Sequence, residues 1–305
     1  MKSIKSIENS EINHIQSMYS KTILIVGIDS EIGGNLKKSL LQNGFIVEGT
    51  SRKKKSLSKG VTYLDLRDPD FKLINKKFDS VIICAAITNI LKCEESPTES
   101  KKINVINTIK LIDSALKNDS FVVFLSSNLV FDGAKSFYKH ADITSPKTLY
   151  GQCKKLVEDH IKNNTNNNAC ILRLTKVISK NTPFIKHWEE QLSKGIYINA
   201  YDNKFMSAVS IVSVISAIQV LINSKKSGIF QLGGREEISY YNFAQSYFST
   251  SPKLLKLIKQ GYDIESGKSA KFNSLETNLP FQVELSDSKI FFENYQTNSL
   301  DLLKD

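Results

Sequence analysis

Residues 21–34 read KTILIVGIDSEIGG: an apolar run, a turn with three glycines, and the start of a second periodic pattern. The run over 21–27 is typical of a buried parallel strand. Over 31–43, apolar residues such as Ile32 and Leu36 recur on one face of a predicted helix. A buried strand that leads through a glycine-rich turn into a helix predicts the first unit of an α/β fold.

The same alternation of strands and helices continues downstream. Further strand patterns span 45–49, 61–66, 80–85, 120–126 and 169–174, and helical patterns span 101–116 and 149–162. Strands that alternate with helices imply right-handed crossovers and a parallel sheet covered on both faces. We therefore predict an α/β fold with a Rossmann-type, doubly wound parallel sheet.

The pattern becomes less regular after about residue 175. Helical patterns span 182–194, 209–223 and 239–249, and a strand pattern spans 227–232. We predict three regions: a polar extension over 1–20, a Rossmann domain over 21–175 and a smaller C-terminal region over 176–305. Some segments of the last region are expected to return to the Rossmann domain.

The composition is that of an ordinary soluble protein. Of 305 residues, 41% are hydrophobic and 24% charged, and no apolar run approaches the roughly 18 residues that span a bilayer. Residues 1–20 lack the apolar core of a secretory signal. Scattered cysteines and histidines predict a cytoplasmic protein without a disulfide framework or a catalytic metal. The net charge of +10 comes without an aromatic-interleaved basic face, so we expect neither nucleic acid nor a membrane as partner.

The turn after the first predicted strand is suited to an anion. Glycines there permit a tight turn and let backbone N–H groups approach a pyrophosphate at the helix N-terminus. Residue 30 is serine where a glycine would be expected, and its side chain would either crowd the diphosphate or hydrogen-bond to it. The predicted cofactor contacts in this turn are Gly27, Ser30, Glu31, Ile32 and Gly33.

The ends of the next two strands bear on the choice of dinucleotide. Ser51 and Arg52 end the second strand. Arginine with small hydroxyl residues suits the 2′-phosphate of NADP, whereas a carboxylate would suit the ribose of NAD. We favour NADP, with NAD as the alternative. Asp65, followed by Leu66, ends the third strand, and it either accepts a hydrogen bond from the adenine amino group or caps the next turn.

A candidate catalytic group lies on the helix predicted over 149–162. Tyr150 and Lys154 are four residues apart and share a helix face. A positive charge beside a phenol stabilises phenolate and lowers its pKa from the usual value of about 10. Ser127, at the end of a buried strand, can hold a carbonyl oxygen near that phenol. Many helices carry an exposed Tyr and Lys at this spacing, but Ser127 and the glycine turn favour oxidation or reduction with a hydride carrier.

These motifs together resemble a known superfamily. They are Gly27-x-x-Ser30-x-x-Gly33, Cys84-Ala85-Ala86-x-Thr88, Asn104-Val105, Ser126-Ser127-Asn128-Leu129-Val130-Phe131-Asp132-Gly133, Pro146-x-x-x-Tyr150-Gly151-x-x-Lys154, Leu172-Arg173 and Gly228-Ile-Phe-Gln-Leu-Gly233-Gly234. Over about residues 21 to 250 the chain resembles the extended short-chain dehydrogenases/reductases. Within that superfamily it most resembles the dTDP-4-dehydrorhamnose reductases and related nucleotide-sugar reductases.

The resemblance implies NAD(P)H-dependent reduction of a nucleotide-linked 4-keto-6-deoxy sugar, in the synthesis of cell-surface polysaccharide precursors. Ser127 would bind the carbonyl, Tyr150 would be the general acid/base, and Lys154 would hold the nicotinamide ribose. Asn104 would support a water relay. Residues implied for the cofactor cleft are Ala85, Ala86, Tyr150 and Lys154, and those for the substrate are Ser127, Asn128, Lys204 and Arg235. The region 176–305 would bind the substrate, and a homodimer, common in the superfamily, stays open.

Departures from the family pattern leave alternatives open. Asn128 and Leu129 stand where rhamnose reductases usually have Asp-Tyr, and the proline expected within 202–207 is absent. Epimerisation or dehydration on the same scaffold is one alternative. A non-catalytic, nucleotide-binding regulatory subunit is another, and Ser30 is the feature that most favours it.

Overall fold

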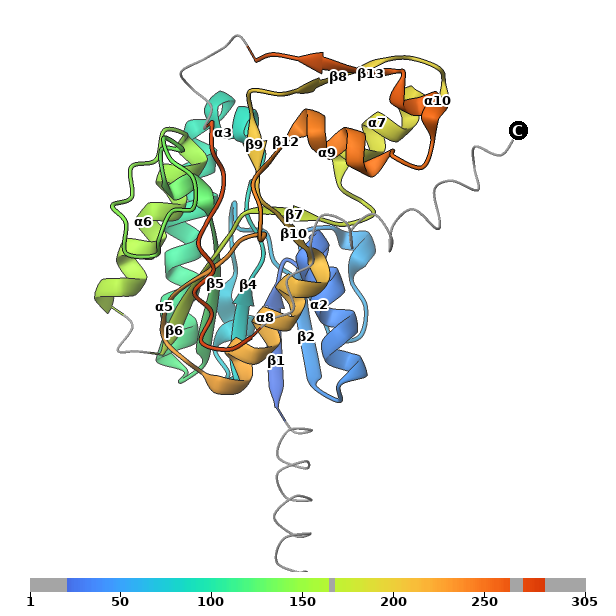
Figure 1. The fold of residues 1–305 in the computed structure, drawn as a ribbon. Coiled ribbons are helices and arrows are strands. Elements are labelled where there is room, and N and C mark those ends of the chain that lie inside the picture. Colours follow the sequence, from blue (N-terminus) through green and yellow to red (C-terminus); the bar gives the residue numbers. More distant parts are fainter. Residues whose placement is uncertain (1–20, 165–167, 264–270, 283–305) are drawn as a thin grey trace, which may run out of the picture. The chain divides into compact units, whose positions relative to one another are not determined.

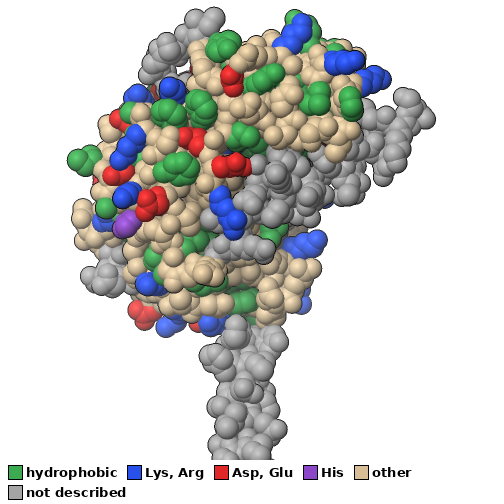
Figure 2. Space-filling view, in the orientation of Figure 1, with side chains coloured by type: hydrophobic (Ala, Val, Ile, Leu, Met, Phe, Trp, Pro, Cys, Tyr) green, Lys and Arg blue, Asp and Glu red, His purple; other side chains and the backbone are tan. Residues whose placement is uncertain are grey.

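The computed structural model describes residues 21–164, 168–263 and 271–282. The polar extension predicted over 1–20 lies outside the described residues, as does the end of the chain from residue 283. Within the described residues, no helix is both long enough and apolar enough to cross a membrane. On the face drawn in Figure 2, lysine and arginine side chains stand among acidic ones.

A seven-stranded sheet is the centre of the fold (Figure 1). Its strands are β1 (Thr22–Val26), β2 (Ile46–Ser51), β3 (Val61–Tyr63), β4 (Ser80–Ile83), β5 (Phe121–Ser127), β6 (Ala169–Leu174) and β11 (Gly228–Leu232). Their order is β11-β6-β5-β4-β1-β2-β3. The pairs β1/β2, β1/β4, β2/β3 and β4/β5 are parallel. The strand order reverses at β1, as in Rossmann folds, so the predicted fold class is confirmed.

The first helix begins where the sequence predicts it. Ser30 is the N-cap of α2 (Glu31–Gln42), and its side chain accepts a hydrogen bond from the backbone N–H of Gly33. Leu36 and Leu40 lie on the buried face and are 0% exposed. An N-cap hydroxyl that satisfies a free helical N–H typically contributes about 1 kcal/mol to stability.

The other α-helices of the described residues include those predicted from the sequence and three short ones, α3, α4 and α10, that were not predicted. They are α3 (Ile90–Glu95), α4 (Pro97–Lys101), α5 (Thr108–Lys117), α6 (Leu149–Asn164), α7 (Pro183–Ser193), α8 (Ile211–Ser224), α9 (Tyr240–Tyr247) and α10 (Pro252–Leu255). Short one-turn elements are η1 (Lys54–Ser56), η2 (Phe71–Ile74) and η4 (Asn128–Val130). The prediction of one regular helix over 101–116 was wrong in its first part, where η3 (Lys102–Asn107) is a π-helix. An apolar period near 3.6 does not distinguish the two helix types at this length.

The chain forms two compact units, each built from separate stretches. Of the described residues, the first unit takes 21–125, 156–164, 168–171 and 218–228. The second takes 126–155, 172–217, 229–263 and 271–282. The single boundary predicted after residue 175 stays a prediction.

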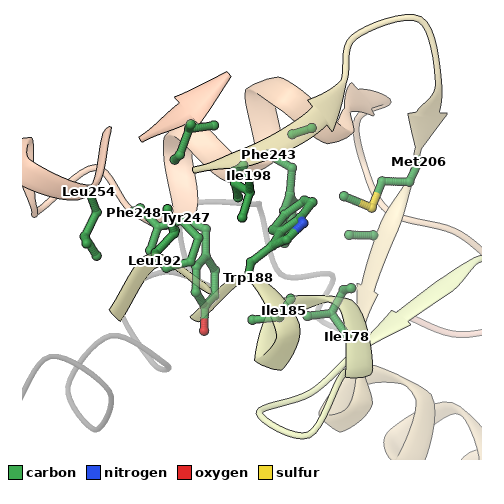
Figure 3. Close-up of a cluster of buried hydrophobic side chains, with 14 residues drawn as sticks. Ile178, Ile185, Trp188, Leu192, Ile198, Met206, Phe243, Tyr247, Phe248 and Leu254 are labelled. Atoms are coloured by element: carbon green, nitrogen blue, oxygen red, sulfur yellow. The ribbon is translucent and has the colours of Figure 1, made fainter. Parts of the chain in front are cut away.

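The second unit has its own core, which Figure 3 shows. Three two-stranded sheets belong to it: β7 (Lys176–Ile178) with β10 (Ala208–Ser210), β8 (Ile198–Tyr201) with β13 (Ile258–Gly261), and β9 (Phe205–Met206) with β12 (Ile238–Ser239). Trp188 of α7 packs with Ile198 of β8 and with Phe243 and Tyr247 of α9. Aliphatic and aromatic side chains both contribute to this core, and each aromatic one removes a large apolar area from water.

Candidate active site

The turn after β1 has no space for side chains at two of its glycines. Gly27 has φ of +88°, and a Cβ there would lie 2.8 Å from the backbone N of Ala85. A Cβ at Gly33 would lie 2.4 Å from the carbonyl oxygen of Gly27. Both distances are too short for a real contact, so the tight turn requires glycine at positions 27 and 33.

Ser30 is accommodated within this turn. Its Oγ donates to the carbonyl oxygen of Gly27 at 2.8 Å and accepts from the N–H of Gly33 at 3.0 Å. The side chain therefore closes the turn and caps α2 at once. This is a local role that a glycine at position 30 could not have, since it has no side chain.

A cavity of about 480 Å³ opens beside this turn, within the first unit. It is lined by the turn itself and by the segments that follow β2, β3 and β4. A volume of this size is in the range of small-molecule and cofactor sites. The predicted cofactor residues that line it are Gly27, Ser30, Ser51, Arg52, Asp65, Leu66, Ala85 and Ala86. Glu31, Ile32 and Gly33 are not among its lining residues.

Carboxylates and cations meet on the wall at the ends of β2 and β3. Arg67 holds Asp65 with its guanidinium, Nε to Oδ1 at 3.1 Å and Nη2 to Oδ2 at 2.6 Å. These hydrogen bonds keep the pKa of Asp65 below its ordinary value. Asp29 accepts a hydrogen bond from Ser51 Oγ. Asp29 and Arg67 also line the cavity, and neither was predicted from the sequence, because their partners Ser51 and Asp65 become apparent only in the folded chain.

Asn104 supports the loop that follows β4. It belongs to the π-helical turn η3 and is 2% exposed. Its Oδ1 accepts from the N–H of Ile87 at 2.8 Å, and its Nδ2 donates to the carbonyl oxygen of Ile87 at 2.9 Å. Ile87 lines the cavity, so the Asn104 amide holds one wall of the cavity by its backbone.

The second unit carries the three residues of the candidate catalytic group. Tyr150 and Lys154 lie on α6, are 8% and 5% exposed, and have the Lys154 Nζ 5.7 Å from the centroid of the Tyr150 ring. A Cβ at Gly151 would lie 2.0 Å from the carbonyl oxygen of Leu129. Glycine therefore lets α6 approach the backbone just after Ser127 as closely as it does.

Ser127 ends β5 and is 9% exposed. Its Oγ accepts from the N–H of Leu129 at 3.2 Å and donates to Oδ1 of Asn128 at 3.2 Å. Asn128 in turn donates to Oδ1 of Asn273 at 2.9 Å. The hydroxyl proton of Ser127 thus has a replaceable side-chain acceptor, an amide oxygen that a ligand carbonyl can displace.

The other residues expected at the substrate lie elsewhere in the second unit. Lys204 forms an ion pair with Asp263 and lies over the ring of Tyr201 at 5.3 Å, so its charge already has an anionic partner. Arg235 is exposed in the segment after β11. Among the residues that the structure describes, no three His, Cys, Asp or Glu side chains form a group that could hold a metal ion.

A Rossmann-type sheet with a glycine turn beside a cavity, and a Ser/Tyr/Lys group in the same chain, define an oxidoreductase of the short-chain dehydrogenase/reductase type. Comparison with protein families makes this more specific. The family described as the RmlD substrate binding domain matches residues 21–272, and the chain belongs to this family. The match extends beyond residue 250, where the resemblance read from the sequence ended.

Individual relatives are more distant. The dTDP-4-dehydrorhamnose reductase of Aggregatibacter actinomycetemcomitans is 26% identical over 238 residues, which are 74% of this chain and 78% of the relative. The methionine adenosyltransferase 2 subunit beta of Bos taurus is 24% identical over 236 residues, or 74% of this chain and 70% of the relative. The structure of dTDP-4-dehydrorhamnose reductase from Bacillus anthracis in complex with NADP has a TM-score of 0.79 at 17% identity, covering 91% of this chain and 99% of that one. That likeness shows the shared fold.

Proposed function

We propose that the protein reduces the ketone of a nucleotide-linked 4-keto-6-deoxy sugar with NAD(P)H, as a step toward cell-surface polysaccharide precursors. The observation that carries the proposal is the association of Lys154 with Tyr150 on a helix whose Gly151 contacts the backbone next to Ser127. Similarity to a dTDP-4-dehydrorhamnose reductase supports the choice of substrate class.

Each residue of the group has a defined task in this proposal. The Lys154 ammonium favours the phenolate form of Tyr150, so the tyrosine releases its proton to the substrate oxygen more readily. Ser127 donates its hydroxyl proton to the same oxygen, where a hydrogen bond is worth most as negative charge develops. The hydride would come from the nicotinamide of a bound NAD(P)H. Asn104 acts as a positioning residue through the backbone of Ile87.

The residues around the cavity fit a dinucleotide. The turn at Gly27 and Gly33 requires glycine, and the N-terminus of α2 that follows it favours an anion. Arg52 and Lys53 line the same cavity and suit a 2′-phosphate, so NADPH is the favoured cofactor and NADH the alternative. The other residues predicted for the cofactor are proposed to bind it from the turn, from the strand ends and, for Tyr150 and Lys154, from α6.

The sugar nucleotide is proposed to bind in the second unit, with Ser127, Asn128, Lys204 and Arg235 as contacts. For Lys204 to hold a diphosphate, its ion pair with Asp263 must open or be shared. Diphosphate carries more negative charge than one carboxylate and would compete with Asp263 for the lysine. A homodimer stays part of the proposal.

Turnover tests the proposal directly. Purified protein is incubated with NADPH or NADH and a panel of nucleotide 4-keto-6-deoxy sugars, and the loss of reduced-cofactor absorbance is followed. A Tyr150→Phe variant is expected to lose about 10²- to 10⁴-fold in kcat, the usual contribution of a general acid, while still binding cofactor. No turnover with any sugar, together with no cofactor binding by calorimetry, would refute the proposal. Full activity of Tyr150→Phe would refute the assigned role of the tyrosine.

A second candidate function has one observation in its favour. The similarity to methionine adenosyltransferase 2 subunit beta is nearly as extensive as that to the reductase. In a role as such a subunit, the protein would bind dinucleotide without turning over any sugar, and would change the kinetics of a methionine adenosyltransferase added to it. Epimerisation or dehydration would instead consume the sugar without net loss of reduced cofactor, which analysis of the sugar product detects.

A further inference from the structure

Asp29 lies in the glycine turn, yet the structure ties it to the end of β2. The N–H of Ile28 donates to the carbonyl oxygen of Thr50 at 2.9 Å, and the N–H of Gly27 donates to Thr50 Oγ1 at 3.2 Å. Ser51 Oγ then donates to the Asp29 carboxylate itself. Three successive residues of the turn are thus bound to the last two residues of β2, and both Asp29 and Ser51 line the cavity.

The Asp29 carboxylate is ionised and keeps acceptor capacity. Its small loss of solvent would raise its pKa, but hydrogen bonds from Ser51 and Ser56 and the charges of Lys53 and Arg52 hold the pKa below its ordinary value. A carboxylate has about four acceptor positions, and two hydroxyl donors leave room for further ones. Asp29 therefore offers the cavity a negatively charged acceptor at neutral pH.

The Ser51 hydroxyl, in contrast to the Asp29 carboxylate, has its hydrogen-bonding capacity already in use. Its Oγ donates to Asp29 and accepts from the N–H of Lys53 at 2.9 Å. The hydroxyl proton that would otherwise be available to a phosphate is directed to a carboxylate. At the end of β2 the cavity therefore meets the Asp29 carboxylate, a hydrogen-bond acceptor, beside the cations Arg52 and Lys53.

We propose that Asp29 is a specificity-determining residue for the dinucleotide: it accepts hydrogen bonds from the adenosine ribose hydroxyls and weakens binding of a ligand that carries a 2′-phosphate. In dinucleotide-binding folds an acid at the end of the second strand binds the ribose 2′-OH. In this chain β2 ends in Ser51 and not in an acid. Asp29, from the turn after β1, accepts a hydrogen bond from Ser51 and so brings a carboxylate to the end of β2. This inference rests on the proposed function, since it requires a dinucleotide in the cavity.

The preference of the cavity then reflects a competition between charges of opposite sign. Arg52 and Lys53 attract a 2′-phosphate, whereas Asp29 repels it and favours the free hydroxyl. Removing the Asp29 charge is expected to tighten NADPH binding and to weaken NADH binding, each about three- to tenfold, because the charges involved are solvent-exposed and screened. Removing the Arg52 charge is expected to shift the preference the other way.

Calorimetric titration of the full chain with NADH and with NADPH tests this without reference to turnover. The variant is Asp29→Asn, which keeps the shape and an acceptor for Ser51 but removes the charge. Asp68→Asn is the matched control, because Asp68 is exposed, does not line the cavity, and gives the same change in net charge. Asp29→Ser is the second variant, and thermal melting confirms that each protein is folded.

The expected result is that the ratio of the NADH to the NADPH dissociation constant rises at least about tenfold in Asp29→Asn and Asp29→Ser, and stays unchanged in Asp68→Asn. An unchanged ratio in either folded Asp29 variant, with both cofactors still binding, would overturn the assignment of Asp29 and leave the proposed function standing. A wild-type protein that is folded but binds neither cofactor would overturn the proposed function as well.

Discussion

Replacement of Gly151 by alanine is the most direct perturbation of the candidate catalytic group. The new Cβ would lie 2.0 Å from the carbonyl oxygen of Leu129, 2.9 Å from its carbonyl carbon and 3.0 Å from Pro146 Cβ. Real Cβ contacts are not shorter than 3.0 Å, so α6 and the backbone at Leu129 must separate by about 1 Å. The obstacle is main chain, which cannot rotate away as a flexible side chain can.

That separation would displace both Tyr150 on α6 and Ser127 beside Leu129. Tyr150 precedes Gly151 on α6, and Ser127 Oγ accepts from the N–H of Leu129. A misplacement of about 1 Å can reduce rate about 10²-fold, and forcing an extra methyl into a packed site destabilises a protein by about 1–3 kcal/mol. We therefore expect Gly151→Ala to lose about 10²-fold in kcat and to melt at lower temperature than the wild type.

Steady-state reduction of the accepted sugar nucleotide and thermal melting measure the two effects. Gly34→Ala is the control for stability, since Gly34 is also helical and its Cβ would meet only an ordinary contact, Ile28 O at 3.4 Å. Alanine is the better helix former by about 1 kcal/mol, so this variant should melt at the same or a higher temperature. Wild-type kcat and melting temperature in Gly151→Ala would refute the claim that the close approach of α6 positions the group.

Two further predictions concern the first unit. Gly27→Ala combines a strained φ with a contact of 2.8 Å to the loop after β4, so cofactor binding measured by calorimetry should fall below detection in whatever protein remains folded. Arg67→Gln removes the guanidinium hydrogen bonds that are the main cause of the lowered pKa of Asp65, and leaves the one from the backbone N–H of residue 67. Because that pKa is lowered in the folded state, the stabilisation is complete above the ordinary pKa of an aspartate, near 3.8, and is lost as pH falls through the folded value. Melting temperatures of wild type and Arg67→Gln should therefore differ at neutral pH and converge in acid; a gap that widens in acid would contradict the prediction.

The fold could be predicted from the sequence because its signals are local. The strand at β1 is a continuous apolar run, and the helix after it has a clear apolar face and a serine N-cap. These features depend on neighbours within about four residues, which is the range that hydrophobic periodicity and capping patterns report. The strand ends were less accurate: β3 ends at Tyr63 and β4 at Ile83, earlier than predicted, because pairing with a neighbouring strand decides where a strand stops.

The candidate site likewise combines residues that the sequence predicts with contacts that only the structure shows. Ser127, Tyr150 and Lys154 are predicted from residue type and spacing alone. The two backbone hydrogen bonds of Asn104 are not, because its partner Ile87 is 17 residues away in the sequence. Leu275 was also missed: a Cβ at Gly233 would lie 2.4 Å from the Leu275 carbonyl oxygen, a contact between segments with no common motif.

By itself, the sequence determined that this chain forms a Rossmann-type sheet, has glycines in the turn after its first strand, and carries a serine, a tyrosine and a lysine at spacings suited to carbonyl chemistry. Only the tertiary structure decided that Ser30 closes the turn, that Gly151 lets α6 approach Leu129, and that Asp29 is bound to Ser51. The physical reason is how far apart in the sequence the interacting residues lie. Burial and helix periodicity depend on adjacent residues, whereas Asp29 and Ser51 are 22 positions apart and meet because β1 and β2 pair in parallel.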